Sequence, residues 1–211
     1  MEASVPACLP GDLELGSPLE AVAARGWAHL PAALAPGFVT ALQREIEAGP
    51  FEAGEREVGQ VHQELGGYVV AAGDPDRPLT ERLRRELGAR IRAEGAGLEG
   101  LAGFDPNEVH VQRYPSAGVG ITPHRDGTRF RRLIAVATTR GRARFSVHAE
   151  RHAPPTAAWQ VGPGDLVLLR GPGLGGVEDG RPLHAVGGSL GDETRYSVSV
   201  RHNARTASGH G

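Results

Sequence analysis

The hydrophobic pattern of this 211-residue chain changes period once, and that change constrains the fold more than any other feature. From about Glu108 onward, apolar and polar residues alternate in short stretches rich in β-branched residues. Alternation with period two is typical of strands that bury one face. Five such stretches follow one another without a helical pattern between them: EVHVQRY, RLIAVATT, RARFSVH, WQVGPGDLVLLRG and TRYSVSVRHN. This succession predicts an antiparallel sandwich or barrel and not a parallel α/β sheet.

The first hundred residues carry a helical pattern instead. Apolar residues recur every four positions in GFVTALQREIEAG and again in LTERLRRELGARIRAEG, which predicts two amphipathic helices. The Gly- and Glu-rich stretch between them predicts loops and a short strand at 67–71. We expect one domain over 1–211, in which a helical part at 1–104 packs on a β-rich core at 105–203, followed by a loose tail at 204–211.

Composition excludes several kinds of chemistry. All 23 basic residues are arginine, so no lysine can form a Schiff base, and any carboxylate held by a cation must be held by Arg. Cys8 is the single cysteine, which excludes an intrachain disulfide and a cysteine-rich zinc site. No apolar run approaches the roughly 18–20 residues of a membrane span, and the N-terminus lacks the pattern of a secretory signal. We therefore expect a cytoplasmic protein without a membrane partner.

The stretch ITPHRDGTRF places His124 and Asp126 two residues apart. On a strand, such residues project from the same face with Cα atoms roughly 6.5–7 Å apart, so both could bind one metal ion. A His-x-Asp pair alone is a weak signal, because chance produces it often. His184 adds weight, since it directly follows the Gly-rich segment 171–182. The informative feature is the order in which these residues occur: Tyr114, His124, Asp126, His184 and then Arg195.

The strand predicted at 194–203 has one face made only of polar residues, namely Arg195, Ser197, Ser199 and Arg201. The opposite face is apolar. A strand of this kind turns its polar face either to water or into a polar cavity. The neighbouring His and Asp residues favour the cavity.

This order of motifs resembles that of the iron(II)/2-oxoglutarate-dependent oxygenases, over about residues 105–203. Members of that superfamily carry His-x-Asp/Glu, a distal His and then an Arg on a double-stranded β-helix, the cupin-like jelly roll. RYSVSVR is similar to the Arg-x-Asn-x-Thr-x-Arg run of AlkB-type demethylases, with Ser197 in place of Asn. GWAHLPAALAPGFVTAL is similar to the opening of phytanoyl-CoA-hydroxylase-type members. The resemblance implies a mainly β jelly roll with N-terminal α-helices.

The resemblance also implies a role for each residue of the set. Three side chains would bind Fe(II) on one side and leave positions for 2-oxoglutarate and O2: His124, Asp126 and His184. Four would line the 2-oxoglutarate site, where the arginine fork and a hydroxyl hold the far carboxylate: Arg195, Ser197, Tyr114 and Arg201. Gln112 stands where the superfamily often has Asn two residues before the Tyr. The carboxylate at 126 argues against the halogenase variant, which needs that position vacant for chloride.

The implied function is a dioxygenase that oxidises a C–H bond of a small polar metabolite, by hydroxylation, oxidative cyclisation or desaturation, as in natural-product biosynthesis. An AlkB-type nucleic-acid demethylase is an alternative, since the run 125–151 contains eight Arg. Only 5% of residues are aromatic, however, and none interleaves with these arginines to stack a base. The other alternative is a non-catalytic cupin-like binding module.

Two further His-containing segments have metal-like spacing. His148, Glu150 and His152 could bind a metal from one face of an extended segment, but the following APPT predicts a solvated hairpin tip. His62 and Glu64 lie in an acidic stretch, where they are either surface residues or part of a substrate-facing lid.

The same acidic stretch bears on the substrate. Its glutamates could face a cationic small molecule, such as an aminosugar or an amino-acid derivative: Glu52, Glu55, Glu57 and Glu64. We expect the loops over the open end of the barrel at 50–75 and 171–182.

Overall fold

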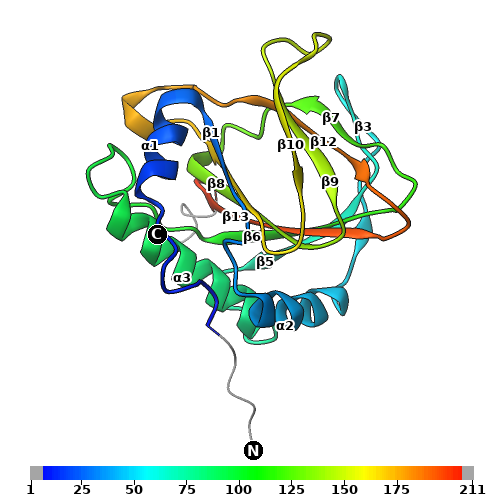
Figure 1. The fold of residues 1–211 in the computed structure, drawn as a ribbon, viewed down its shortest axis with the longest axis horizontal. Coiled ribbons are helices and arrows are strands. Elements are labelled where there is room, and N and C mark those ends of the chain that lie inside the picture. The colour runs from blue at the N-terminus through cyan, green and yellow to red at the C-terminus, as the bar shows by residue number, and fades with distance from the viewer. Residues whose placement is uncertain (1–6, 206–211) are drawn as a thin grey trace, which may run out of the picture.

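Two antiparallel sheets face each other in the computed structural model, which describes residues 7–205 (Figure 1). The major sheet has seven strands in the order β1-β11-β8-β13-β6-β5-β2. Their bounds are β1 Trp27–Leu30, β2 Glu52–Ala53, β5 Gly66–Ala71, β6 Glu108–Tyr114, β8 Phe130–Arg140, β11 Leu166–Arg170 and β13 Arg195–Asn203. The minor sheet has the order β10-β9-β12-β7. Its strands are β7 Gly120–His124, β9 Ala143–His148, β10 Pro155–Val161 and β12 Leu183–Ser189.

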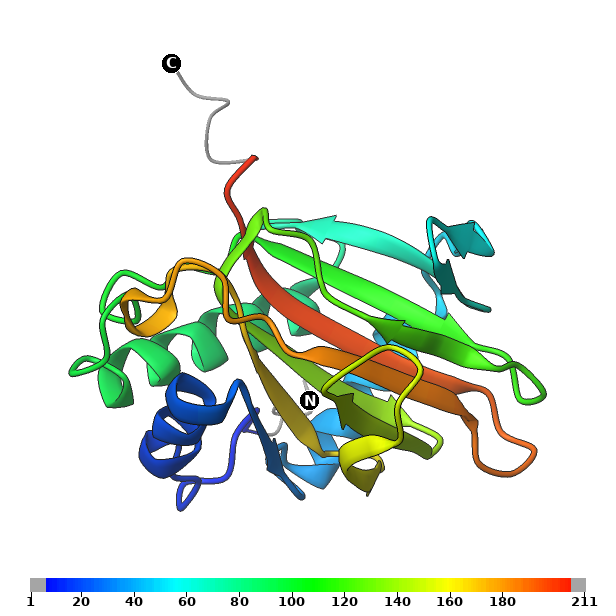
Figure 2. The same ribbon diagram turned by 90° about the horizontal axis from the view of Figure 1, so that it is seen from above.

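From β6 onward the chain passes back and forth between the two sheets. β6, β8, β11 and β13 belong to the major sheet, and the strands between them belong to the minor sheet (Figure 2). This alternation defines the double-stranded β-helix, so the predicted mainly β jelly roll is confirmed. All strand pairs are antiparallel, as the short alternating stretches predicted.

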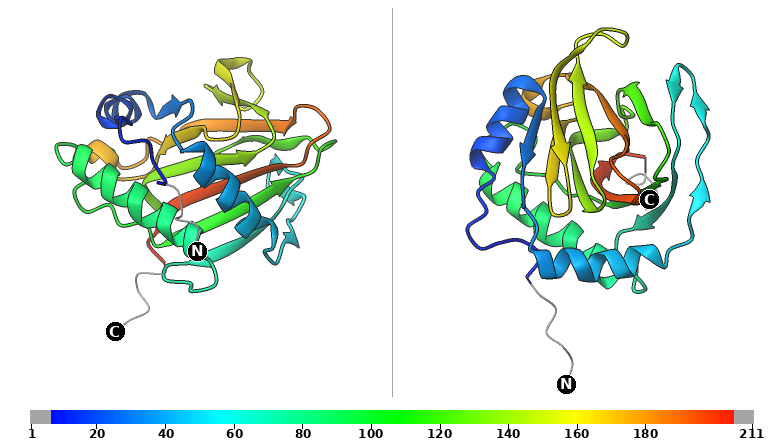
Figure 3. Two further views of the ribbon diagram at one scale, coloured as in Figure 1. Left: turned by 60° about the horizontal axis from the view of Figure 1, so that its bottom comes forward. Right: turned by 45° about the vertical axis from the view of Figure 1, so that its right-hand side comes forward.

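The helices lie against the major sheet on the side away from the minor sheet (Figure 3). They are α1 Gly16–Arg25, α2 Pro36–Glu47 and α3 Pro78–Glu94. The two helices predicted from four-residue spacing correspond to α2 and α3, whose apolar stripes are buried. The Glu45 carboxylate of α2 accepts hydrogen bonds from the Leu79 and Thr80 amides, and so caps the first turn of α3. No helix within residues 7–205 is long and apolar enough to cross a membrane.

The N-terminal half contributes more strand than its sequence pattern predicted. Besides the predicted strand, which forms β5, it supplies β1 and β2 to the edges of the major sheet. β3 (Glu57–Val58) and β4 (Val61–His62) form a separate hairpin beside β7. These strands have only two to four residues, too few for a periodic pattern to be recognised. The Ala204 amide donates to the Arg129 carbonyl and the Arg205 amide to Asn203 Oδ1, and residues 206–211 of the predicted tail lie outside the described residues.

β13 lies in the middle of the major sheet and separates two apolar clusters. Tyr196, Val198 and Val200 pack in the cluster beneath the helices. Arg195 and Arg201 line a cavity on the other side, between the sheets. The polar face of this strand therefore points into the barrel, as its alternation and neighbouring motifs predicted.

The approach of β7 to β12 depends on glycine at position 120. Gly120 has φ 81°, and a Cβ there would lie 2.1 Å from the Val186 carbonyl oxygen. Any side chain would push the two strands apart. The same pairing sets His124 directly opposite His184 in the register.

Gly120→Ala should destabilise the fold by at least about 2 kcal/mol, because it combines left-handed strain with a backbone clash. We expect a fall in melting temperature of roughly 4–8 °C. Gly187→Ala is the matched control on the facing strand, where an added Cβ meets its nearest atom at an ordinary 3.6 Å. Equal melting temperatures for the two variants would contradict this account of the β7–β12 pairing.

Candidate metal centre

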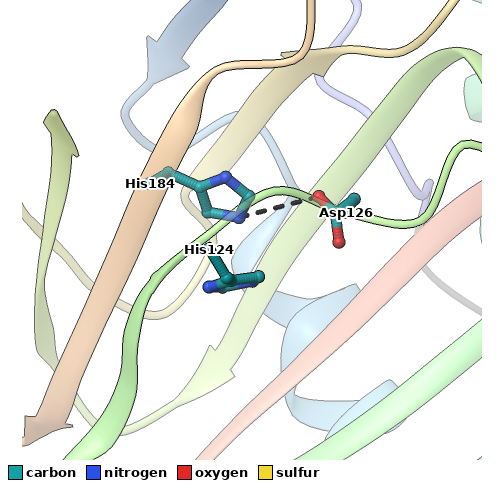
Figure 4. A group of neighbouring side chains, drawn as sticks. All are labelled: His124, Asp126 and His184. Carbon is teal, nitrogen blue, oxygen red and sulfur yellow. Dashed lines mark ion pairs between the residues drawn. The ribbon is translucent and has the colours of Figure 1, made fainter. Parts of the chain in front are cut away.

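Three side chains from separate parts of the chain converge between the sheets: His124 at the end of β7, Asp126 just beyond it and His184 near the start of β12 (Figure 4). One ligand atom from each lies within 4.8 Å of the others. The His184 Nε2 is 3.6 Å from the Asp126 Oδ2. Within residues 7–205 this is the one group of three or more His, Cys, Asp or Glu residues whose ligand atoms come this close.

Both imidazoles are held in the same way. The Nδ1 of His124 lies 3.0 Å from the Thr122 carbonyl oxygen, and the Nδ1 of His184 lies 3.1 Å from that of Pro182. A carbonyl only accepts, so each Nδ1 carries the proton and each Nε2 offers its lone pair. Burial, and then the neighbouring His184, lower the pKa of His124 to about 4. Neutral imidazoles with a free Nε2 suit a metal ion.

Other residues fix the three ligands from outside. The Phe145 ring stacks on His184, with centroids 5.5 Å apart and planes 5° apart. Arg181 donates to the Asp126 backbone carbonyl and pairs with Asp179 at the surface. Arg151 donates to the Pro123 carbonyl, next to His124. The chain thus holds the ligand set in place from β9, from the hairpin tip and from the Gly-rich segment.

A guanidinium is buried across the same cavity. Arg195 is only 2% exposed and donates from Nη2 to Thr138 Oγ1 at 3.2 Å, with the side chain of Tyr114 beside it. Its Cζ lies 4.8 Å from the Tyr114 ring centroid. The Nε and Nη1 of Arg195 and the Oγ of Ser197 are buried without a hydrogen-bond partner.

The unpaired charge of Arg195 can be compared with what 2-oxoglutarate, the implied co-substrate, would need. Burial lowers the pKa of Arg195, but an arginine stays protonated at any physiological pH. A buried charge without a counter-ion is costly, on the order of several kcal/mol. Two free N–H donors and a free hydroxyl match a carboxylate, which can accept from all three. The donor set therefore fits a dicarboxylic acid that reaches from the metal to Arg195.

Tyr114 and Arg201 both line this cavity, but they differ in what they offer a ligand. Burial raises the pKa of Tyr114, which stays a neutral donor beside Arg195 and Ser197. The Arg201 Nε donates to the Glu108 carboxylate at 2.7 Å, so its charge is already paired. Sequence reasoning missed Glu108, although period two places it on the same face of β6 as Tyr114.

Residues of the other metal-like clusters make local contacts of their own. His148 lies within hydrogen-bond distance of Ser146 and of the Ala153 carbonyl, in a hairpin whose Glu150 and His152 are exposed. His62 pairs with Glu57 inside the β3–β4 hairpin. Glu64 accepts from the Val119 amide. The predicted solvated hairpin tip agrees with these contacts.

Comparisons with known proteins find no match by sequence and several by fold. No family model and no curated protein matches the chain. Solved structures do match, among them a prolyl hydroxylase from Trichoplax adhaerens in complex with a hypoxia inducible factor peptide fragment, with a TM-score of 0.65, 13% identity and 92% of this chain and 91% of that one covered. The epimerase SnoN, in its complex with Fe3+, alpha ketoglutarate and nogalamycin RO, has a TM-score of 0.55 and 18% identity. The match covers 88% of this chain and 83% of that one. OsALKBH1 has a TM-score of 0.59 and 15% identity, with 85% of this chain and 97% of that one covered.

These likenesses define the class of fold. The chain has the jelly roll of the iron(II)/2-oxoglutarate oxygenases, as its motif order predicted, over nearly its full length. At 13–18% identity these likenesses establish the architecture, and the chemistry must be argued from the side chains of this chain.

A divalent metal should stabilise the protein through the three converging side chains. We expect Mn(II), a redox-stable substitute for Fe(II), to add about 2.7 kcal/mol at a hundredfold excess over its Kd, which raises the melting temperature by roughly 5–11 °C. His184→Ala and Asp126→Ala should abolish the increase. His152→Ala is the control, because that imidazole is exposed on the hairpin tip and should leave the increase unchanged. A full metal response in His184→Ala would exclude this ligand set.

Proposed function

We propose that this protein is an Fe(II)/2-oxoglutarate-dependent dioxygenase that oxidises a C–H bond of a small polar metabolite. The observation that carries the proposal is the buried, unpaired Arg195 guanidinium in a cavity that it shares with His124, Asp126 and His184. A His-Asp-His cluster alone could hold a structural metal, and a buried arginine alone could bind an unrelated anion. Together they match the two ends of 2-oxoglutarate, one chelated by metal and one held by an arginine fork.

Each residue has a task in this reaction. The two imidazoles and the Asp126 carboxylate would bind Fe(II) from one side, so that its remaining positions face the cavity. Bound iron would supply the activation of O2, coupled to the conversion of 2-oxoglutarate to succinate and CO2. Arg195 and Ser197 would fix the far carboxylate, and Tyr114 would keep water from that end of the cavity. Thr138 orients the Arg195 fork through its hydroxyl.

The two hairpins that border the site support a small substrate. The His62 amide donates to Thr122 Oγ1 at 2.9 Å, which fastens the β3–β4 hairpin to β7 two residues before His124. Arg151 ties the opposite hairpin tip to Pro123. Both segments are anchored beside the ligands, which favours a metabolite of limited size over a macromolecular surface.

Arg195→Gln should weaken the use of 2-oxoglutarate without lowering the stability of the ligand-free protein. Without a carboxylate to hold, the buried charge is a cost, so we expect the ligand-free variant to melt at the same temperature as the parent protein or higher. The KM for 2-oxoglutarate should rise at least roughly 30-fold, since a lost buried charge pair costs about 2–5 kcal/mol. Succinate release with Fe(II) and ascorbate under air measures this.

Arg140→Gln is the control for that variant, because Arg140 pairs with Glu47 at the surface. The parent protein should also show a weak visible band when Fe(II) and 2-oxoglutarate are added without oxygen, and His124→Ala should lose it. A parent protein that gives neither band nor succinate would be a cupin-like binding module instead.

The likeness to OsALKBH1 keeps nucleic-acid demethylation as a second candidate. Within residues 7–205 the exposed large hydrophobic side chains are all aliphatic, so no exposed aromatic ring offers a platform for a base. The arginines of 125–151 are also dispersed, since Arg132 bonds to the Gly103 carbonyl and Arg140 pairs with Glu47.

We therefore expect no binding of a single-stranded oligonucleotide at low salt, measured by fluorescence anisotropy with DNA and RNA. A nucleic-acid enzyme would bind in the micromolar range and weaken steeply as salt is added, because phosphate contacts release counterions. Salt-sensitive binding that His184→Ala leaves intact, together with base oxidation by the parent protein, would replace the metabolite proposal with the demethylase.

A further inference from the structure

A second cavity lies between α2 and the end of β8, on the side of the major sheet that carries the helices (Figure 3). This α2–β8 cleft is lined among others by Leu34, Val39, Gln43 and Thr139, and its volume of about 510 Å³ is typical of a small-molecule site. Its walls come from α2, the segment between β1 and α2, the end of β8 and the turn before β11. The proposed reaction gives this cleft no task.

One polar group in the wall of the cleft is a carboxamide with one half unpaired. Gln43 is only 9% exposed, and its Oε1 accepts from the Thr139 hydroxyl at 2.6 Å. Its Nε2 is buried without a hydrogen-bond partner in residues 7–205. Such a donor is destabilising, because it has given up its hydrogen bonds to water and gained none in the protein. An oxygen atom delivered by a ligand would remove that cost.

β8 holds the Gln43 amide in this orientation. Consecutive residues of a strand point to opposite faces. Thr138 accordingly bonds to Arg195 inside the barrel, whereas Thr139 bonds to Gln43 on the helix side. Thr139 is itself only 4% exposed, so its hydroxyl has little access to water as an alternative partner. The unpaired donor is thus fixed before any ligand binds, which reduces the entropy lost on binding.

The segment between β1 and α2 is strained where it borders the cleft. Ala32 has φ 49°, in the left-handed region that a residue with a Cβ rarely adopts. The Asp165 carboxylate accepts from the Ala32 amide at 3.0 Å, and the Leu34 amide donates to the Gly164 carbonyl. Strain of this kind persists only where the surrounding contacts enforce it, and it is common at ligand sites. The cleft therefore has a second wall that is fixed in advance.

The walls also select the kind of ligand. Leu34 and Val39 present apolar surface, and Gln43 requires an oxygen acceptor. A carboxylate suits this position poorly, because the amide carries no charge and a buried anion without a counter-ion is costly. The charged residues that border the cleft are exposed and include both signs: Arg44, Arg140 and Glu193. A neutral acceptor on an apolar body fits these walls best.

We propose that the α2–β8 cleft is a second binding site, for a small neutral molecule with an apolar body and a carbonyl oxygen, and that Gln43 Nε2 donates to this oxygen. Ketones, esters and amides share this chemistry. The site does not depend on the proposed function, because within residues 7–205 the cleft and the cavity of the metal centre have no lining residue in common.

Ligand-observed NMR titration with four small probes measures the dissociation constants that test this site. The probes share a phenyl ring and differ in their polar group: acetophenone, toluene, benzoate and benzylamine. Acetophenone should bind the parent protein at least about fivefold more tightly than each of the others, because it alone offers the buried donor an uncharged acceptor.

Three variants locate the binding. Gln43→Leu keeps the apolar wall but lacks the donor, so acetophenone should lose its advantage over toluene. Gln160→Leu is the matched control, because that glutamine is exposed on β10 and its loss should leave the advantage unchanged. Thr40→Trp places a large ring at an exposed position of the cleft and should abolish saturable binding of acetophenone. The melting temperature of each variant shows that it is folded.

The site is supported by an advantage of acetophenone that Gln43→Leu removes, that Gln160→Leu keeps and that Thr40→Trp abolishes together with binding. It is overturned by no saturable binding to the parent protein, by equal binding of acetophenone and toluene, or by tightest binding of benzoate or benzylamine. Binding that survives Thr40→Trp, or an advantage that survives Gln43→Leu, overturns it as well. Mn(II) and 2-oxoglutarate should not displace acetophenone, since displacement would place the probe in the metal cavity and exclude the cleft.

Discussion

The structure depends on one costly feature, a fully buried arginine without a counter-ion. Arg195 opens the central strand of the major sheet, and its charge must be offset by the stability of everything around it. The apolar face of the same strand contributes that stability, because Tyr196, Val198 and Val200 pack beneath the helices. The strand thus stabilises the fold on one face and keeps an unsatisfied binding group on the other. Such a cost is typical of a group that meets its partner only when a ligand binds.

The jelly-roll topology accounts for how distant residues reach this group. Because the chain alternates between the two sheets, β7 and β12 become neighbours although 60 residues separate His124 on β7 from His184 on β12. The pairing places His124 opposite His184, and the facing strand β13 presents Arg195 from the other sheet. Under the proposed function, one sheet would supply the metal-binding wall of the cavity and the other the anion-binding wall. Rigid walls would keep both ends of a bound dicarboxylate at a constant separation.

Much of this arrangement could be predicted from the sequence, for identifiable reasons. The polar face of β13 follows from period two alone, and the order His124, Asp126, His184, Arg195 carried the resemblance that supplied the fold. The residues that fix these groups could not be found in that way. Phe145, Thr138 and Arg181 reach the site through strand register, a bulge in β8 and the path of a Gly-rich segment, none of which has a local pattern. β1 and the β3–β4 hairpin were missed because they are too short to show a period.

Charges counted along the sequence differ from the charges that the folded chain leaves unpaired. The glutamate-rich stretch suggested a cationic ligand, and the structure brings part of it near a basic residue, since Glu64 Oε1 lies 3.8 Å from Arg56 Nη1. What a ligand experiences is the charge that remains after such pairing, weighted by its distance from the reacting centre. Of the charged groups around His124, Asp126 and His184, Arg201 is paired with Glu108 and Arg181 with Asp179, whereas Arg195 in the same cavity has no carboxylate partner. A chain with a net charge of −2 can therefore keep one positive charge buried at its cavity, because paired charges largely cancel and that of Arg195 does not.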